Sequence, residues 1–263
     1  MPTVLVHDSP VHYATRGTGP GLLLVHATGT DSATNFGHMV DHFTAGRTVI
    51  MPDFAGSGAT PLGERPLTLG LLADQVTAAA DAVTDEPYDV MGFSLGAVVA
   101  AAAAAARPER IRRLVLVCPW TRDDDPRQRL LMDLWQRLPH LEERAYQEFT
   151  VLSVFSGPYL SALGPDGITA GTELIRAETA VFRQMALAAG ADLRDRLGRI
   201  TAPTLVIGAS QDHWFPVGHA RETHRAIAGS RYAELDCGHM AVFERTTEVV
   251  ALARDFLGGF TGC

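Results

Sequence analysis

The chain alternates short, largely apolar runs with longer segments of helical periodicity. Four of these runs are typical of strands buried on both faces of a sheet, and they occupy residues 22–25, 48–51, 88–91 and 114–117. Between them, residues 69–83 place apolar side chains on one helical face, and residues 97–106 form an alanine-rich run of high helix propensity. This alternation predicts a parallel sheet with helices packed on it, which is the α/β class.

The ends of the chain extend this pattern, and its middle interrupts it. Residues 4–6 and 11–15 are typical of a hairpin around residues 8–10, and residues 36–43 are predicted as a short helix. Near the other end we expect a strand, a helix, a strand and a closing helix at residues 204–207, 217–227, 231–235 and 242–256. Residues 127–199 show helical periods and no convincing central strand, so this block is predicted to be an insertion between two strands.

The composition fits one large α/β domain, or a core with an insertion, and excludes several kinds of chemistry. The chain has 263 residues, of which 46% are hydrophobic and 20% are charged, so it can bury a sizeable core. The formal net charge is −8 and the arginines form no stripe, so no nucleic-acid partner is expected. The sequence contains no lysine, which excludes Ser-Lys dyads, Schiff-base chemistry and P-loop lysines.

The cysteines and the start of the chain indicate a cytoplasmic protein that uses neither a metal nor a cofactor. Cys118, Cys237 and Cys263 are too few and too scattered for a disulfide framework, and neither cysteine nor histidine spacing suggests a metal site. Residues 1–5 lack the features of a signal peptide. No apolar run is long enough to span a bilayer, so no membrane partner is expected.

The strongest chemical signal is Gly92-Phe93-Ser94-Leu95-Gly96, which lies between a predicted strand and a predicted helix. A direct turn from strand to helix strains the residue at the turn and raises its side chain above the sheet, at the positive end of the helix. The motif therefore predicts that Ser94 is an exposed nucleophile. The alternative is a glycine-rich turn with an N-capping serine, which needs no chemistry.

A serine nucleophile needs a base, and the base needs an acid that orients it. Asp212 follows the predicted strand 204–207, and His239 follows the predicted strand 231–235, so both belong to the sheet edge of Ser94. The chain order Ser, Asp, His is that of the hydrolase fold. Two alternatives remain open: Asp123 or Asp124 could supply the acid, and His239 could be a structural histidine.

Five features in register carry a resemblance that covers essentially the whole chain. They are His26 with Gly29, Pro52-Asp53 with Gly56 and Gly58, residues 92–96, residues 208–212, and Gly238-His239. With them the chain resembles the α/β-hydrolase superfamily, and its residues 22–31 are similar to the enol-lactonase and metal-free haloperoxidase branch. The resemblance implies a mostly parallel eight-stranded sheet flanked by helices, with a helical cap after the sixth strand. Residues 1–120 and 200–263 would form the core, and residues 121–199 would form the cap.

The resemblance also implies roles for individual residues. Ser94 would be the nucleophile, His239 the general base and then acid, and Asp212 its orienting acid, while the backbone N–H groups of Thr28 and Leu95 would form the oxyanion hole. The family usually has glycine at the position of Ala27, and a β-carbon there could shift the Thr28 amide; losing one such donor costs about 2.7–4 kcal/mol. Asp53 is expected to be structural. The predicted substrate-contacting residues are His26, which should also hold its loop, Phe93, Trp120, Trp135, Phe155 and Met240.

These residues predict a serine hydrolase that cleaves a carboxylic ester, a lactone or a thioester of a small to medium hydrophobic substrate. One alternative is a carbon–carbon bond hydrolase of vinylogous diketones, which would need an arginine facing the cleft. Another is a non-hydrolytic ligand-binding protein or a cyclase on the same scaffold. The expected partner is a small-molecule substrate, and the protein is expected to be a monomer or a homodimer.

Overall fold

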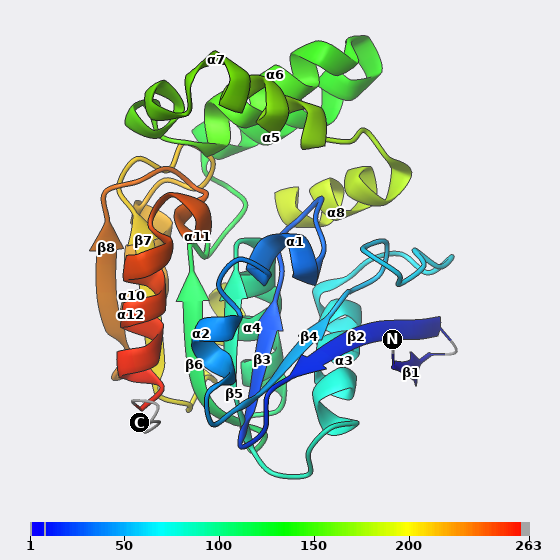
Figure 1. The fold of residues 1–263 in the computed structure, drawn as a ribbon, viewed down its shortest axis with the longest axis vertical. Helices are drawn as coiled ribbons and strands as arrows, with labels where there is room; N and C mark the ends of the chain where they lie inside the picture. The colour runs from blue at the N-terminus through cyan, green and yellow to red at the C-terminus, as the bar shows by residue number, and fades with distance from the viewer. Residues whose placement is uncertain (1, 8, 259–263) are drawn as a thin grey trace.

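The structure, a computed structural model, describes residues 2–7 and 9–258; Asp8 in the predicted hairpin turn and Cys263 lie outside these residues. The strands β1 to β8 span Thr3–Val6, Ser9–Arg16, Gly21–Val25, Thr48–Pro52, Tyr88–Phe93, Ile111–Val117, Thr204–Ala209 and Arg231–Leu235. They form one sheet in the order β1-β2-β4-β3-β5-β6-β7-β8 (Figure 1). Only the β1–β2 and β2–β4 pairs are antiparallel among these strands. The predicted α/β class with a mostly parallel, eight-stranded sheet is confirmed.

Helices cover both faces of the sheet, as Figure 1 shows. On one face, α3 (Leu69–Asp81), α4 (Leu95–Ala106) and α10 (Gly218–Ala226) pack their apolar sides against the strands. On the other face, α2 (Asp41–Thr44) and α12 (Thr246–Phe256) do the same. Because both faces are covered, every residue of β3 and β5 is buried, which explains the continuous apolar runs of the sequence.

Four helices between β6 and β7 form a layer over the carboxyl end of the sheet (Figure 1). They are α5 (Pro126–Leu141), α6 (Glu143–Val154), α7 (Gly157–Leu174) and α8 (Thr179–Ala189), and together they are called the helical layer below. α7 is kinked at Gly164, whose φ of 67° is readily adopted by glycine. The short α9 (Arg194–Leu197) leads back to the sheet, where Leu193 N–H donates to the carbonyl oxygen of Thr121. The layer thus leaves and rejoins the sheet at neighbouring points.

Two predicted helices are each divided in two. Residues 36–43 contain the end of α1 (Ser32–Phe36) and the start of α2, because Asp31 accepts the Thr34 N–H and begins a helix earlier than predicted. The predicted closing helix consists of α11 (Ala241–Glu244) and α12, because Arg245 between them has non-helical φ and ψ of −131° and 42°. Within residues 2–7 and 9–258, no helix combines the length and apolar character needed to cross a membrane.

Candidate active site

Ser94 occupies the sharp turn between β5 and α4. Its backbone has φ 56° and ψ −123°, a strained conformation that presents the side chain at the positive end of α4. The flanking glycines make the turn possible: a Cβ at Gly92 would lie 2.2 Å from the carbonyl oxygen of Gly96, and a Cβ at Gly96 would lie 2.0 Å from that of Val25. The alternative of an N-capping serine does not apply, because the Ser94 side chain makes no cap hydrogen bond.

A chain of hydrogen bonds joins Ser94, His239 and Asp212. Ser94 Oγ lies 2.8 Å from His239 Nε2, and His239 Nδ1 lies 2.7 Å from Asp212 Oδ2. These residues meet because each follows the carboxyl end of a strand, β5, β8 or β7, at one edge of the sheet. Since the Asp212 carboxylate accepts from Nδ1–H, Nε2 is left free to accept the hydroxyl proton of Ser94.

The Asp212 carboxylate is held on both of its oxygens. Oδ1 accepts the backbone N–H groups of Trp214 and Phe215 at 2.8 and 2.9 Å, and Oδ2 faces the imidazole. Asp123 and Asp124, the alternative acids suggested by the sequence, instead face arginines near the surface. The structure therefore places Asp212, rather than either of these residues, beside the imidazole.

The imidazole of His239 is surrounded by aromatic rings. The ring centroids of Phe93, Trp214 and Phe215 lie 5.6, 5.8 and 5.4 Å from it. Trp120 stacks on Phe215 with centroids 3.8 Å apart and is fully buried. Trp120 therefore packs behind a neighbour of His239 and does not line the cavity beside Ser94, contrary to its predicted place in the substrate site.

His26 is also fully buried and holds its own loop. Its Nδ1–H donates to the carbonyl oxygen of Ala27 at 2.8 Å, and its Nε2 accepts the Phe54 N–H at 3.3 Å. Burial lowers the pKa of His26, so the ring is neutral, in agreement with these two bonds. Because the ring stacks on Phe54 inside the core, His26 does not line the cavity beside Ser94, contrary to its predicted place in the substrate site.

A cavity of about 340 Å³ opens beside Ser94 and His239, beneath the helical layer. Thr28 lines it, and so do the four remaining predicted substrate-contacting residues, Phe93, Trp135, Phe155 and Met240. The helical layer contributes a largely apolar and aromatic wall that includes Tyr146, Val151, Val154, Tyr159, Leu163, Leu174, Ile175 and Val181. A wall of this kind favours an apolar ligand.

The loop before α1 contains Thr28, whose amide the sequence assigns to an oxyanion hole. The amides on either side of it are held by buried side chains: Ala27 N–H donates to Asn35 Oδ1 at 2.7 Å, and Gly29 N–H donates to Gln184 Oε1 at 2.9 Å. Among residues 2–7 and 9–258, Thr28 N–H makes no hydrogen bond. Ala27 and Thr28 both line the cavity, so the Thr28 amide lies at the cavity wall between the two anchored amides.

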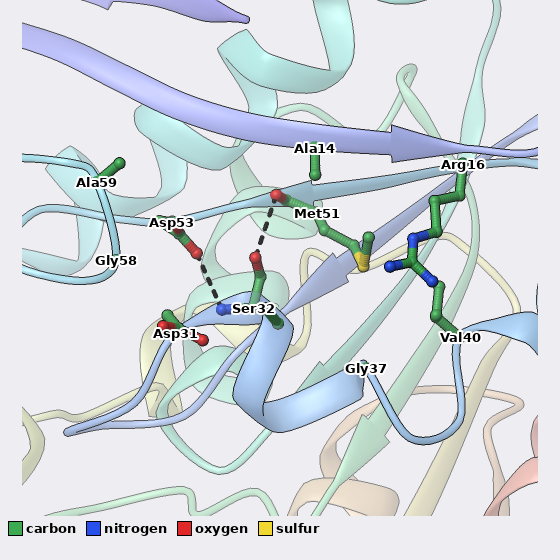
Figure 2. A pocket seen from close by; sticks show the side chains of 11 residues that line it. Ala14, Arg16, Asp31, Ser32, Gly37, Val40, Met51, Asp53, Gly58 and Ala59 are labelled. Carbon is green, nitrogen blue, oxygen red and sulfur yellow. Dashed lines mark hydrogen bonds between the residues drawn. The ribbon is translucent and has the colours of Figure 1, made fainter. Parts of the chain in front are cut away.

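A second cavity, of about 220 Å³, lies next to the start of α1 and shows how the other end of this loop is held (Figure 2). Ser32 donates its N–H to Asp53 Oδ1 at 2.9 Å and its hydroxyl to the carbonyl oxygen of Met51 at 3.3 Å. A Cβ at Gly58 would lie 2.0 Å from Asp53 Oδ2, so glycine lets the chain close over this carboxylate. Asp53 thus has the structural role expected from the sequence.

The described residues contain one group that could bind a metal ion, formed by Cys118, Asp212 and His239. Its potential ligand atoms lie within 4.8 Å of one another. However, Asp212 and both ring nitrogens of His239 are engaged in the hydrogen bonds described above, and burial raises the pKa of the Cys118 thiol. The group is therefore better suited to proton transfer than to metal ligation.

Asn35 and Gln184 were not singled out by the sequence analysis. Asn35 lies directly before the predicted short helix, residues 36–43, and no sequence pattern distinguishes it. Gln184 could have been recognised from the sequence, because it lies within the stripe of buried residues of α8 that includes Val181, Met185 and Ala188. A polar residue within such a stripe is normally hydrogen-bonded to a specific partner.

The fold and this geometry agree with what comparison to known families finds. A model of the alpha/beta hydrolase family matches residues 22–252. The chain belongs to the alpha/beta hydrolase family. The predicted resemblance to this superfamily is confirmed, and the hydrolase core accounts for the sheet, the strained turn at Ser94 and the order of the loops.

Similar proteins narrow the class of enzyme. Pyrrolizixenacetamide deacetylase of Xenorhabdus hominickii is 39% identical over 260 residues, which cover 98% of this chain and 98% of the relative. Pimeloyl-(acyl-carrier protein) methyl ester esterase of Neisseria meningitidis is 28% identical over 248 residues, which cover 90% of this chain and 92% of the relative. The enol-lactonase structure from Burkholderia xenovorans LB400 matches with a TM-score of 0.85 and 25% identity, over 97% of this chain and 99% of that one. This family member is therefore a hydrolase.

Proposed function

We propose that the protein is a serine hydrolase that cleaves an ester or amide bond through an acyl-enzyme. The observation that carries this proposal is the hydrogen-bonded chain from Ser94 through His239 to Asp212 at the mouth of an apolar cavity. Ser94 Oγ attacks the substrate carbonyl while His239 Nε2 takes its proton. His239 then returns the proton to the leaving alcohol or amine, and water releases the acyl group by the same steps.

The negative charge of the tetrahedral intermediate needs donors that are in place before the reaction. The amide of Leu95, directly after Ser94 at the start of α4, and the amide of Thr28 are the two candidates. Asp212 keeps the imidazole in the tautomer that accepts from Ser94 and stabilises the imidazolium that forms.

The substrate class follows from the cavity wall and from the relatives. The apolar, aromatic wall suits a hydrophobic compound of small to medium size, and residues 121–199 are proposed as the cap that provides most of this wall. The sequence alone led us to expect an ester, a lactone or a thioester. The 39% identity to a deacetylase adds the acetamide class, and we place an acetylated amine or alcohol first among the candidates.

Two matched substrates test this proposal. A fluorophosphonate probe should label the protein on Ser94, and p-nitrophenyl acetate and p-nitroacetanilide, which differ only in the atom of the leaving group, should report ester and amide cleavage. Labelling with turnover of either substrate supports the proposal. Absence of both labelling and turnover across a panel of esters, lactones, thioesters and anilides contradicts it.

Replacing Gly171 is expected to change substrate size preference without loss of catalysis. Gly171 lines the cavity from α7, and a Cβ built there has no heavy atom within 4 Å among its described neighbours outside its own helix backbone. Gly171→Phe would therefore fill cavity volume. We expect kcat/KM for p-nitrophenyl octanoate to fall at least about tenfold while that for the acetate stays within about threefold.

Gly157→Phe is the matched control for this prediction. Gly157 belongs to the same helix and also has open space around its Cβ, but it does not line the cavity. Equal octanoate-to-acetate ratios in the two variants would mean that this part of α7 does not contact the acyl chain.

One observation favours a second candidate, the carbon–carbon bond hydrolase. Arg176 lines the outer part of the cavity, exposed to solvent, and could bind the carboxylate of a vinylogous diketone. Its NH1 group, however, donates to the carbonyl oxygens of Glu173 and Ile175. A vinylogous diketone acid therefore belongs in the substrate panel, with Arg176→Gln as the variant that should weaken its turnover and spare that of p-nitrophenyl acetate.

A further inference from the structure

Gln184 is the one side chain of α8 that reaches both loops under the helical layer through hydrogen bonds. It is fully buried, and its Oε1 accepts the Gly29 N–H at 2.9 Å. Its Nε2 donates to the carbonyl oxygen of Ala55 at 3.1 Å and to Ser57 Oγ at 3.0 Å. One amide thus joins the loop that contains Thr28 to the loop that follows β4.

We propose that Gln184 is a positioning residue for the oxyanion hole, acting through the Thr28 amide; this inference rests on the proposed serine hydrolase function. Gln184 does not line the cavity, so it is not expected to contact substrate. Its effect is on the orientation of the peptide unit whose N–H would face the oxyanion.

The loop needs such an anchor because of its own sequence. Gly29 has φ 69°, a conformation that glycine leaves and re-enters at little cost, so the peptide units around it are free to rotate unless they are held. Asn35 holds the Ala27 amide on one side of Thr28, and Gln184 holds the Gly29 amide on the other. Removing either bond would let the intervening amide turn away from the site.

The docking of α8 does not itself require an amide at position 184. Apolar packing already seats the helix, because its buried side chains Val181, Met185 and Ala188 belong to the hydrophobic core. The polar atoms of Gln184 therefore serve the loops rather than the attachment of the helix. This separates a positioning role from a purely structural one.

Gln184→Met tests the proposal, because methionine has a similar length but neither accepts from Gly29 N–H nor donates to Ala55. We expect kcat for p-nitrophenyl acetate to fall about 10- to 100-fold, somewhat less than for outright loss of an oxyanion donor, with KM within about twofold. Trifluoroacetophenone, which forms an oxyanionic adduct with an active serine, should bind more weakly by the same factor.

Two further variants make the result specific. Ser57→Ala removes one bond of the same amide but leaves the Gly29 bond, and it should keep kcat within about threefold. Gln184→Asn keeps a polar amide but shortens the side chain, so it should lose the Gly29 bond and show a similar fall in kcat. It replaces the methionine variant if that variant does not fold. Thermal unfolding checks that each variant is folded.

The outcomes separate this inference from the proposed function. A folded Gln184→Met or Gln184→Asn protein with wild-type kcat and wild-type trifluoroacetophenone affinity would overturn the positioning role alone. A fall in kcat matched by an equal rise in KM and no change for trifluoroacetophenone would also overturn it, since substrate binding would then be the property affected. A wild-type protein that neither reacts with a fluorophosphonate nor hydrolyses p-nitrophenyl acetate would overturn the proposed function itself.

Discussion

Replacing Ser94 with alanine is expected to lower kcat for p-nitrophenyl acetate by up to about 10⁶-fold, the scale seen when a serine hydrolase loses its nucleophile. The Ser94 hydroxyl is the nearest hydrogen-bond partner of His239 Nε2, at 2.8 Å, so without it the base has no hydroxyl to activate. The residual rate would come from the oxyanion donors and the cavity acting on water. Steady-state kinetics, with burst-phase measurement on the wild type, check this result.

The fold should survive the Ser94→Ala substitution. Alanine at this position meets the same backbone strain at φ 56°, and the cavity beside the side chain can accept a water molecule in place of the hydroxyl. Ser57→Ala is the matched control, because Ser57 and Ser94 are both 5% exposed and Ser57 bonds to Gln184 instead of to an imidazole. Retention of more than a tenth of wild-type turnover by Ser94→Ala, or its labelling by a fluorophosphonate, would require a different nucleophile.

The local parts of the site could be predicted from the sequence because each is encoded within a few residues. The strained turn requires small residues two positions before and two after Ser94, and the clash distances at Gly92 and Gly96 explain why. Asp212 and His239 could be placed on the same sheet edge as Ser94, because parallel strands share the direction of their carboxyl ends.

The differences between expectation and structure concern the direction in which two side chains point. His26 and Trp120 follow strands, as ligand-contacting residues often do, but His26 turns into the core against Phe54 and Trp120 turns against Phe215. A strand pattern indicates which residues are buried, but at the end of a strand it does not distinguish the core from the wall of a cavity. The periodicity therefore could not separate these two residues from Phe93 and Met240, which do line the cavity.

Contacts between distant segments could not be predicted from the sequence. The helical layer is tied to each of the three loops of the site: Gln184 holds the loop of Thr28, Ser153 Oγ accepts from Trp214 Nε1 at 2.7 Å next to Asp212, and Met240 N–H donates to the Val154 carbonyl at 3.1 Å next to His239. Each bond joins residues that are more than 60 positions apart in the chain. The layer thus helps to form the site that it covers.

Replacing Asp212 with asparagine is expected to lower kcat by about 10⁴-fold, the scale of the equivalent change in a known serine protease. The physical reason is the tautomer of His239. The asparagine carbonyl oxygen would take over the N–H groups of Trp214 and Phe215, which leaves the side-chain NH₂ facing Nδ1. A ring that accepts at Nδ1 carries its proton on Nε2, and such a ring cannot take the proton of Ser94.

Asp123→Asn is the control that separates this role from a general loss of negative charge. Asp123 was an alternative acid from the sequence, but it lies near Arg129 at the surface. An isolated surface ion pair contributes about 0–1 kcal/mol to the stability of the fold. Its substitution should leave kcat within about threefold. Equal losses in the two variants would place the orienting acid elsewhere. A large loss confined to Asp212→Asn, with an unchanged unfolding temperature, would instead tie the rate to one proton on one ring nitrogen of His239, as the proposed acyl-enzyme mechanism requires.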